Sequence, residues 1–342
     1  MRDDELWTRI ERWSSSVGLG EVAAIGVEPF HFDAASVLNQ RASGRHNAME
    51  FTFRRPSRSM DVRVTYPYAE SIIVATYPYA REAGDGVRPI ATYATRDRYS
   101  ELRSYLEGIR AFLKEAGYRA QVVVDDNALM DRVVARRAGL GWVGKSSMIL
   151  NPRSGPHLLI GSVVTNWSYR SNRTLVLRDC GTCDACVRAC PTSALDGEGH
   201  LDARRCLAWL LQKPGTFPME YREAVGVRVY GCDTCLDVCP VGKRSAQMAK
   251  RGPSSLDLLR NLLELSDEAL IATYPHFYVP QRRSAHLRRN VLLAAGNLDI
   301  WDDAIAAGLR RYACSTDPVL AEQARWSLRR YERLGRTRAV VN

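Results

Sequence analysis

Residues 180–191 read CGTCDACVRACP, so that four cysteines and a proline follow the spacing C-x2-C-x2-C-x3-C-P. Residues 232–240 read CDTCLDVCP, and a single cysteine, Cys206, stands between the two runs. The first spacing is typical of proteins with two iron–sulfur clusters, in which the fourth cysteine ligates the other cluster. The pattern predicts two [4Fe-4S] clusters. The expected ligands are Cys180, Cys183, Cys186 and Cys239 for the first cluster, and Cys190, Cys206, Cys232 and Cys235 for the second.

Two other kinds of site also use several cysteines. Zinc takes four thiolates, often from pairs with similar spacing. Zinc pairs do not, however, call for a third cysteine three residues on or a fourth before a proline. A disulfide framework suits short secreted chains, and the N-terminal residues here lack the features of a signal peptide. Iron–sulfur ligation is the interpretation that accounts for all eight cysteines.

The size and composition of the chain set broad limits on its class. Its 342 residues suffice for two or three domains with cores of their own. A hydrophobic fraction of 46% is ordinary for a globular protein, and no apolar run approaches the length of a membrane span. Reduced thiols without an export signal predict a cytoplasmic protein. The net charge of +10 favours an anionic partner, of which nucleic acid is the commonest.

Strands and helices are expected to alternate in the first 165 residues, which predicts an α/β or α+β domain. The expected strands are residues 22–27, 71–77, 121–124 and 158–165, and the expected helices are residues 5–16, about 99–116 and about 129–138. Short helices are expected between the cysteines. From residue 254 the pattern is helical throughout, with helices at residues 256–265, 287–296, 301–312 and 319–334.

Residues 139–146 read GLGWVGKS, which matches both the phosphate-binding loop and the dinucleotide-binding motif. Both motifs need a strand directly before the glycines, so that the following helix presents its N-terminus to phosphate. The preceding residues have a helical pattern instead, so we expect no nucleotide site here. Three glycines in six residues still allow the backbone to approach a flat ligand or another strand closely.

Several stretches resemble the signature of the epoxyqueuosine reductase family. They are residues 124–132 (VDDNALMDR), residues 138–145 (AGLGWVGK), the cysteine runs, residues 202–206 (DARRC) and residues 288–297 (RRNVLLAAGN). The resemblance implies an α+β protein in three parts: an N-terminal α/β domain that binds cobalamin (residues 1–170), a ferredoxin-like module with two [4Fe-4S] clusters (171–252) and a C-terminal HEAT-like helical repeat (253–342). The implied reaction reduces epoxyqueuosine to queuosine at the wobble position of tRNA.

The resemblance also implies site residues and partners. Asp125 aligns with the family's proton donor, which needs burial or a nearby negative charge to raise its pKa from about 3.9. The alternative for Asp125 and Asp126 is that they cap the following helix. Cobalamin is expected against Gly144, Lys145, Met148 and Leu159, and the tRNA anticodon loop against Arg282, Arg283, Arg288 and Arg289. An arginine-rich solvated helix face is the alternative for the last four. An external low-potential electron donor and a monomeric chain are also expected.

The chain departs from the family pattern at four places, all outside the cysteines. They are Asp97-Arg-Tyr-Ser100, Asp126-Asn-Ala128, Leu211-Gln-Lys213 and Pro240-Val-Gly242. These departures leave open a second function, a corrinoid-dependent reductase of a small molecule of the dehalogenase kind. A third function, a ferredoxin-like electron carrier, would leave the N-terminal domain without a role.

Overall fold

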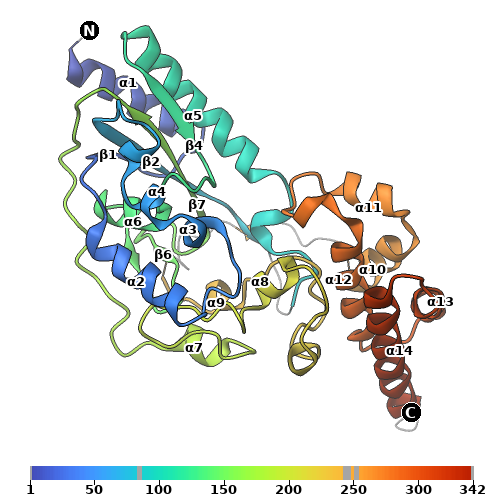
Figure 1. Ribbon diagram of the computed structural model, residues 1–342. Coiled ribbons are helices and arrows are strands. Elements are labelled where there is room, and N and C mark those ends of the chain that lie inside the picture. The colour runs from blue at the N-terminus through green and yellow to red at the C-terminus, as the bar shows by residue number, and fades with distance from the viewer. Residues whose placement is uncertain (1, 83–86, 242–247, 250–253, 340–342) are drawn as a thin grey trace.

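The computed structural model describes residues 2–82, 87–241, 248–249 and 254–339 of the chain. Its three parts follow one another in space as they do in the sequence (Figure 1). A sheet flanked by helices contains the N-terminus, the cysteine-rich segment lies beneath this sheet in the view, and a helical tail extends to the C-terminus at the far end.

The N-terminal part is built on a four-stranded sheet in which all neighbouring strands are antiparallel. The order is β1 (Val22–Gly26), β2 (Ser71–Pro78), β7 (Leu158–Thr165) and β4 (Ala120–Val123). Nearly every residue of the long strands β2 and β7 is buried, because helices cover both faces of the sheet. Antiparallel pairing makes this an α+β fold rather than a parallel α/β sheet.

Two helices cover one face of the sheet, and shorter elements cover the other. Helices α1 (Asp3–Ser16) and α5 (Arg98–Glu115) pack against the residues of β2 and β7 that point to their side. A Cβ atom on Gly161 would lie 2.6 Å from Leu106 Cδ1, so glycine allows α5 to approach β7 closely. The opposite face carries α6 (Asp131–Arg137) and Val62, with α4 (Pro56–Met60) nearby.

The remaining elements of this part are short. They are α2 (His31–Ala42), α3 (Phe51–Arg54), a hairpin of β5 (Trp142–Val143) and β6 (Ile149–Leu150), and β3 (Arg81–Glu82), which pairs in parallel with β8 (Met248–Ala249). The predicted strands and helices of this part are confirmed to within two residues at each end. The sequence did not predict α2, α3 and α4, which lack a regular apolar stripe.

The cysteine-rich segment contains only short helices, as predicted. They are α7 (Ala185–Ala189), α8 (Leu207–Gln212) and α9 (Thr234–Asp237). Leu207, Leu210 and Leu211 of α8 pack with Phe217 and with Leu293 of the tail, so the segment is joined to the tail by an apolar cluster. The predicted boundary near residue 252 stays a prediction, because residues 242–247 and 250–253 lie outside the described residues.

The tail consists of five described helices around one core. They are α10 (Ser255–Glu264), α11 (Asp267–Thr273), α12 (Ser284–Gly296), α13 (Asp303–Ala313) and α14 (Pro318–Ala339). The sequence predicted all of them except α11. Helix α12 is buried along most of its length, and Ala94, Val229 and Tyr230 complete the core from outside the tail. The HEAT-like repeat stays a prediction. Cys314, the one cysteine outside the two predicted groups, is exposed at the end of α13.

In the described part of the chain, no helix combines the length and the apolar character that crossing a bilayer requires.

Candidate functional site

Three members of the first predicted group of cysteines, Cys180, Cys186 and Cys239, come together between α7 and α9. The thiol of Cys186 has a raised pKa, chiefly because of burial and further because of the charges of Cys180 and Cys239. The backbone N–H of Lys145 donates to Cys180 Sγ at 3.4 Å. Cys183, the remaining member of the group, is exposed. The group therefore lies against the glycine-rich turn on one side and reaches the surface on the other.

The second predicted group also comes together. Burial, with the charges of Cys232 and Cys190, raises the pKa of the Cys206 thiol to about 11. Burial and the charges of Cys232 and Cys206 raise the pKa of Cys235 still further. The N–H of Ala194 donates to Cys190 Sγ at 3.3 Å. These four residues come from three separate segments of the sequence.

The chemistry of both groups fits an iron–sulfur cluster. All nine cysteines are free thiols, so no disulfide uses the eight. Burial makes the Cys206 thiol hard to ionise although other thiols lie close to it. Backbone N–H groups nevertheless point at two of the sulfur atoms, as they do at anionic sulfur. A bound metal cluster supplies the positive charge that ionises such thiols and compensates their mutual repulsion.

Two aspartates between the last cysteines hold the second run against the N-terminal part. Asp233 is buried, and its Oδ2 accepts from the Thr92 N–H at 2.6 Å. Arg88 donates to Asp237 at 2.5 Å and to Asp233 at 3.4 Å, and His157 Nε2 lies 3.4 Å from Asp237 Oδ1. The sequence did not predict this network. Its signal was the presence of two acidic residues inside a cysteine run.

Asp125 follows β4 directly and adopts a left-handed backbone conformation with φ of 51°. Solvent reaches its side chain, yet burial raises the pKa of the carboxyl, and the charge of Asp126 adds to that effect. The positive charge of Arg103 lowers the pKa of Asp125 and so opposes both of these effects. Non-glycine residues in this conformation are uncommon and cluster at functional sites.

The capping alternative for the two aspartates is wrong. Helix α6 begins at Asp131, and its N-cap residue, Met130, has no side-chain hydrogen bond to the helix. Asp126 instead shapes the loop, since its Oδ1 accepts from the Ala128 N–H at 2.8 Å and lies 3.4 Å from Arg58. Asp125 is left with its carboxyl available.

A second carboxyl, unforeseen in the sequence analysis, lies beside Asp125. Burial raises the pKa of Asp131 to about 8, and the charge of Asp125 contributes. The charges of both carboxyls, after burial, raise the pKa of Tyr99. Tyr230 is also a neighbour, since burial and the charge of Asp125 raise its pKa to about 12. Asp125 therefore interacts electrostatically with one half-buried acid and two phenols.

Aromatic side chains connect this site to the tail. The rings of Tyr274, Phe277 and Tyr230 form a stack, with centroids 4.4 Å and 3.9 Å apart. The Tyr230 hydroxyl accepts from the N–H of Tyr278 at 2.8 Å. The side chain of Tyr278 is 47% exposed and lies against Phe51, at a ring distance of 5.5 Å. An exposed aromatic ring therefore lies one hydrogen bond away from a neighbour of Asp125.

The glycine-rich turn follows a helix, as the sequence analysis expected. Helix α6 ends at Arg137, and the glycines lead into the β5–β6 hairpin rather than into a helix. The Gly144 N–H donates to Met148 O at 2.9 Å, which closes the hairpin. Lys145 Nζ donates to Gly181 O at 2.8 Å. Gly144, Lys145 and Met148, three of the predicted cobalamin contacts, thus form one turn beside Cys180.

The fourth predicted cobalamin contact, Leu159, is wrong. It is 7% exposed and packs in the core between the sheet and helices α1 and α5. Side chains alternate along a strand, so Leu159 points away from the face that carries α6. The apolar run of β7 gave no sign of which residues face which side.

Two of the four predicted tRNA-binding arginines are also wrong. Arg288 and Arg289 are 0% and 1% exposed. Arg288 donates to the carbonyl oxygens of Leu262 and Leu265, and Arg289 donates to backbone carbonyl oxygens of residues 210–215. These guanidinium groups hold α12 in place and cannot meet a phosphate.

The other two arginines remain at the surface. Arg282 and Arg283 are exposed, and Gln281 and Arg282 both have a positive φ, of 52° and 53°. Arg282 donates to the carbonyl oxygens of Ile271, Pro275 and Phe277, so it fixes the loop that carries Tyr278. Arg283 is the better candidate for a phosphate contact.

Besides Asp126, two departures from the family pattern have structural roles. Ser100 and Asp97 cap α5, since the Ser100 N–H donates to Asp97 Oδ1 at 3.0 Å. Leu211 is buried in the apolar cluster with α12, and Lys213 Nζ donates to Asn47 Oδ1 at 2.8 Å. Gly242, at the end of the fourth departure, lies outside the described residues. Because these residues cap a helix or pack in the core, their departure from the family pattern does not indicate a different substrate.

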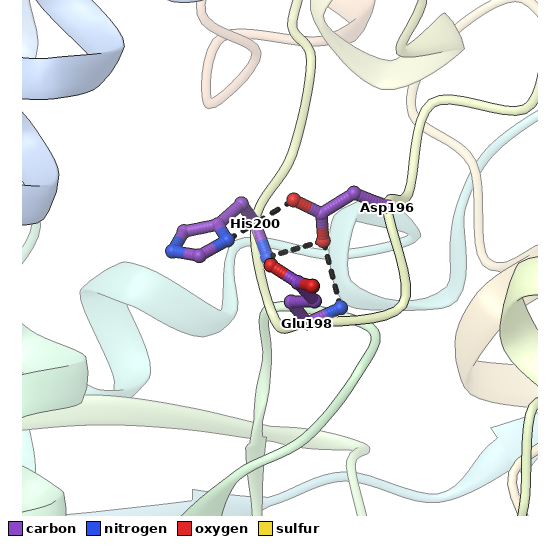
Figure 2. Close-up of side chains that lie close together, drawn as sticks. All are labelled: Asp196, Glu198 and His200. Carbon is purple, nitrogen blue, oxygen red and sulfur yellow. Dashed lines mark hydrogen bonds and ion pairs between the residues drawn. The ribbon is translucent and has the colours of Figure 1, made fainter.

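A loop between Cys190 and Cys206 brings three potential metal ligands together (Figure 2). The ligand atoms of Asp196, Glu198 and His200 lie within 4.8 Å of one another. Asp196 Oδ1 accepts from the N–H groups of Glu198 and His200, and Asp196 Oδ2 lies 3.0 Å from His200 Nδ1. These contacts close the loop, and we assign no metal to it.

Comparison with known proteins gives matches over a segment and over nearly the whole chain. Residues 179–242 match the family described as 4Fe-4S double cluster binding domain. The epoxyqueuosine reductase of Bacillus cereus is 28% identical over 345 residues, which cover 95% of this chain and 89% of that protein.

Solved structures agree with the sequence matches. An epoxyqueuosine reductase bound to a tRNA-Tyr stem loop modified with epoxyqueuosine is 26% identical, with a TM-score of 0.84 over 96% of this chain and 90% of that chain. The Bacillus subtilis epoxyqueuosine reductase, solved with its catalytic aspartate loop swung out of the active site, is 26% identical, with a TM-score of 0.82 over 96% and 91%. We conclude that the chain resembles the epoxyqueuosine reductases over nearly its whole length and is an epoxyqueuosine reductase-like oxidoreductase.

Proposed function

We propose that the protein reduces epoxyqueuosine to queuosine at the wobble position of tRNA, using two [4Fe-4S] clusters and cobalamin. The reaction takes two electrons and two protons and converts the epoxide to an alkene and water. An external low-potential donor supplies the electrons. The observation that carries the proposal is that two groups of four cysteines and the acid Asp125 belong to one chain that matches the family over nearly its whole length.

The residues of the glycine-rich turn fit cobalamin. Val143 is an apolar side chain that is 39% exposed, and Met148 is half-buried. The buried indole N–H of Trp142 has no acceptor among the described residues. Amide oxygens at the edge of a corrin would provide one. When bound there, cobalamin supplies a strongly reducing cobalt centre, and the protein contributes binding, orientation and protons.

Asp125 is proposed to donate a proton to the departing epoxide oxygen. General acids work best with a pKa near the working pH, and burial together with Asp126 moves the pKa of Asp125 in that direction. Its left-handed backbone suits a loop that changes conformation, as the catalytic aspartate loop of the Bacillus subtilis enzyme does.

The surface beside Asp125 suits an unpaired RNA loop. Proteins read single-stranded RNA by stacking its bases on aromatic side chains and by contacting phosphates with basic ones. Tyr278 offers an exposed ring next to Tyr230, and Arg283 is exposed five residues further along the chain. We propose that these two side chains contact the anticodon loop.

Conversion of the modified nucleoside tests this function directly. Reconstituted, reduced protein is incubated without oxygen with tRNA that carries epoxyqueuosine, and the nucleosides are separated and weighed by mass spectrometry. Wild-type protein should produce queuosine. The Asp125→Asn variant should retain iron, cobalamin and tRNA binding but lose turnover, because the amide cannot donate the proton.

Asp126→Asn is the matched control, since an amide oxygen can still accept from Ala128 and the neighbouring Asp125 is untouched. It should retain turnover at a lower rate, because Asp125 keeps its carboxyl but loses the neighbouring charge that helps to raise its pKa. If protein that holds both clusters, cobalamin and tRNA leaves epoxyqueuosine unchanged, the proposed substrate is wrong.

A further inference from the structure

Reduction of an epoxide by two electrons consumes two protons, and a single carboxyl can hold only one. Asp125 is accessible in the free protein, but an RNA loop bound at the site would separate it from bulk water. The second proton then needs a source within the protein. This inference rests on the proposed function and concerns that source.

Asp131 has the surroundings of a carboxyl that keeps its proton. Its Oδ1 is fully buried and has no hydrogen-bond partner among the described residues. The adjacent Arg132 does not hydrogen-bond this oxygen, and its Nη1 donates instead to Ser147 O at 2.5 Å. An ionised carboxylate buried without a donor is costly, and such a group normally stays neutral.

The charged groups around Asp131 lead to the same conclusion. Asp125 and Asp126 both disfavour its ionisation, and only Arg132 favours it. Together with burial they raise the pKa of Asp131 to about 8. Tyr99 faces both carboxyls, and its own raised pKa keeps it neutral at physiological pH. At neutral pH Asp131 therefore holds a proton, and its charge state is coupled to that of Asp125.

A structural role does not explain this carboxyl. Asp131 is the first residue of α6, but no side chain caps that helix. Its neighbours on the sheet-facing side, Val133, Val134 and Ala135, supply the packing of the helix. The carboxyl group of Asp131 adds a desolvation cost and no described hydrogen bond at Oδ1.

We propose that Asp131 holds the second proton of the reaction and passes it to Asp125 after Asp125 has protonated the substrate oxygen. The O–H bond of Asp131 breaks as that of Asp125 re-forms, so each turnover delivers two protons to the site. Both carboxyls then regain their protons from water when the product leaves. Asp131 thus acts through Asp125 and does not itself touch the substrate.

The experiment uses the holoenzyme and compares Asp131→Asn and Asp131→Glu with wild type. The Asn variant keeps the shape of the side chain but cannot release a proton. Its kcat should fall by about a hundredfold, while iron content, cobalamin content and the Kd for tRNA stay unchanged. The wild-type kcat should decline as the pH rises through about 8, because Asp131 is then ionised, and the Asn variant should lack this decline. The Glu variant should restore most of the rate together with the pH dependence.

Infrared difference spectra between pH 6 and pH 10 provide a readout besides activity. Wild-type protein should lose the C=O band of a protonated carboxylic acid with a midpoint near pH 8, and the Asn variant should show no such change. Wild-type kcat and pH profile in the Asn variant, or a spectrum in which Asp131 is already ionised at pH 6, would overturn the inference. If wild-type protein does not convert the substrate at all, the proposed function fails, but the infrared measurement still shows whether Asp131 holds a proton.

Discussion

Asp131 is ionised in an unfolded chain at neutral pH, because its ordinary pKa is 3.8, and folding raises that value to about 8. Between these two values the folded state holds a proton that the unfolded state has released. The free energy of unfolding then decreases by about 1.4 kcal/mol for each unit of rising pH. The residue therefore destabilises the fold most at pH 8 and above, and not at all below pH 3.8.

Replacing Asp131 by Asn should stabilise the protein, by an amount that grows with pH. The amide has no charge in either state, so the variant escapes the destabilisation and gains on the order of a few kcal/mol at neutral pH. Anaerobic thermal unfolding of both holoproteins from pH 5 to pH 8 measures the effect. The difference in apparent Tm should widen steadily across this range. A constant difference would mean that the pKa of Asp131 is not raised by folding.

At the scale of single elements, helix α12 shows how a charged pattern is used for structure. Arg289 donates to the backbone carbonyl oxygens of Leu210, Leu211, Lys213 and Gly215, at the end of α8. Burial and the charge of Arg222 lower the pKa of Arg289 only to about 10, so it stays charged at neutral pH. Its positive charge also complements the negative end of α8. The helix is therefore fastened to the cysteine-rich segment by a buried cation.

Arg289→Met should destabilise the protein by about 3 kcal/mol or more, because several buried carbonyl groups lose their donor. Arg283→Met is the matched control at an exposed position and should change stability by about 0.5 kcal/mol or less. Thermal unfolding of both variants measures the contrast. Equal stabilities would show that Arg289 is not the anchor of α12.

The short helices α7 and α9 are each followed by a cysteine, Cys190 and Cys239, that is predicted to ligate the cluster of the other run. Double variants test this exchange. Cys183→Ala with Cys239→Ala removes two ligands of the same predicted cluster, so the protein should retain about four irons of the original eight. Cys183→Ala with Cys206→Ala removes a ligand from each cluster and should leave almost no iron. Loss of almost all iron in both double variants would mean that the run of residues 180–190 serves a single cluster.

The sequence was a good guide where the signal is local and a poor one where it depends on packing. Cysteine spacing and the helical pattern before Gly139 lie within short windows, and both predictions agree with the arrangement found. Arg288 and Arg289 form a basic pair that is typical of a surface. Only the packing of α12 against α10 and α11 for Arg288, and against α8 for Arg289, shows that both are buried. Asp131 differs from any other helix-start aspartate only by its desolvation, which no local pattern records.

At the scale of the whole molecule, the three parts meet around Asp125. The N-terminal part provides Asp125 and Tyr99, the cysteine-rich segment provides Tyr230, and the tail provides the ring of Phe277 stacked on it. The exposed ring of Tyr278 lies at the same junction. A substrate that reaches Asp125 therefore contacts more than one part of the chain, which suits a large partner such as tRNA better than a small molecule.

Binding of a tRNA stem loop should depend on salt and on these two side chains in different ways. Arg283→Met should lower the slope of log K against log salt by about one, because one phosphate contact is lost. Tyr278→Ala should weaken binding by about 1–3 kcal/mol at every salt concentration and leave the slope unchanged, because stacking is uncharged. Fluorescence anisotropy over a salt series measures both. Unchanged affinity in the two variants would remove this surface from the proposed interface.

The hydrogen bonds from Arg289 to the carbonyl groups after Cys206 have a consequence when oxygen damages the second cluster. Those carbonyl groups lie in and just after helix α8, whose N-cap residue is Cys206, a predicted ligand of the second cluster. A molecule that has lost this iron would lose the anchor of its C-terminal helices as well as its ability to reduce a substrate. Such inactive molecules would then release tRNA instead of withholding it from intact enzyme.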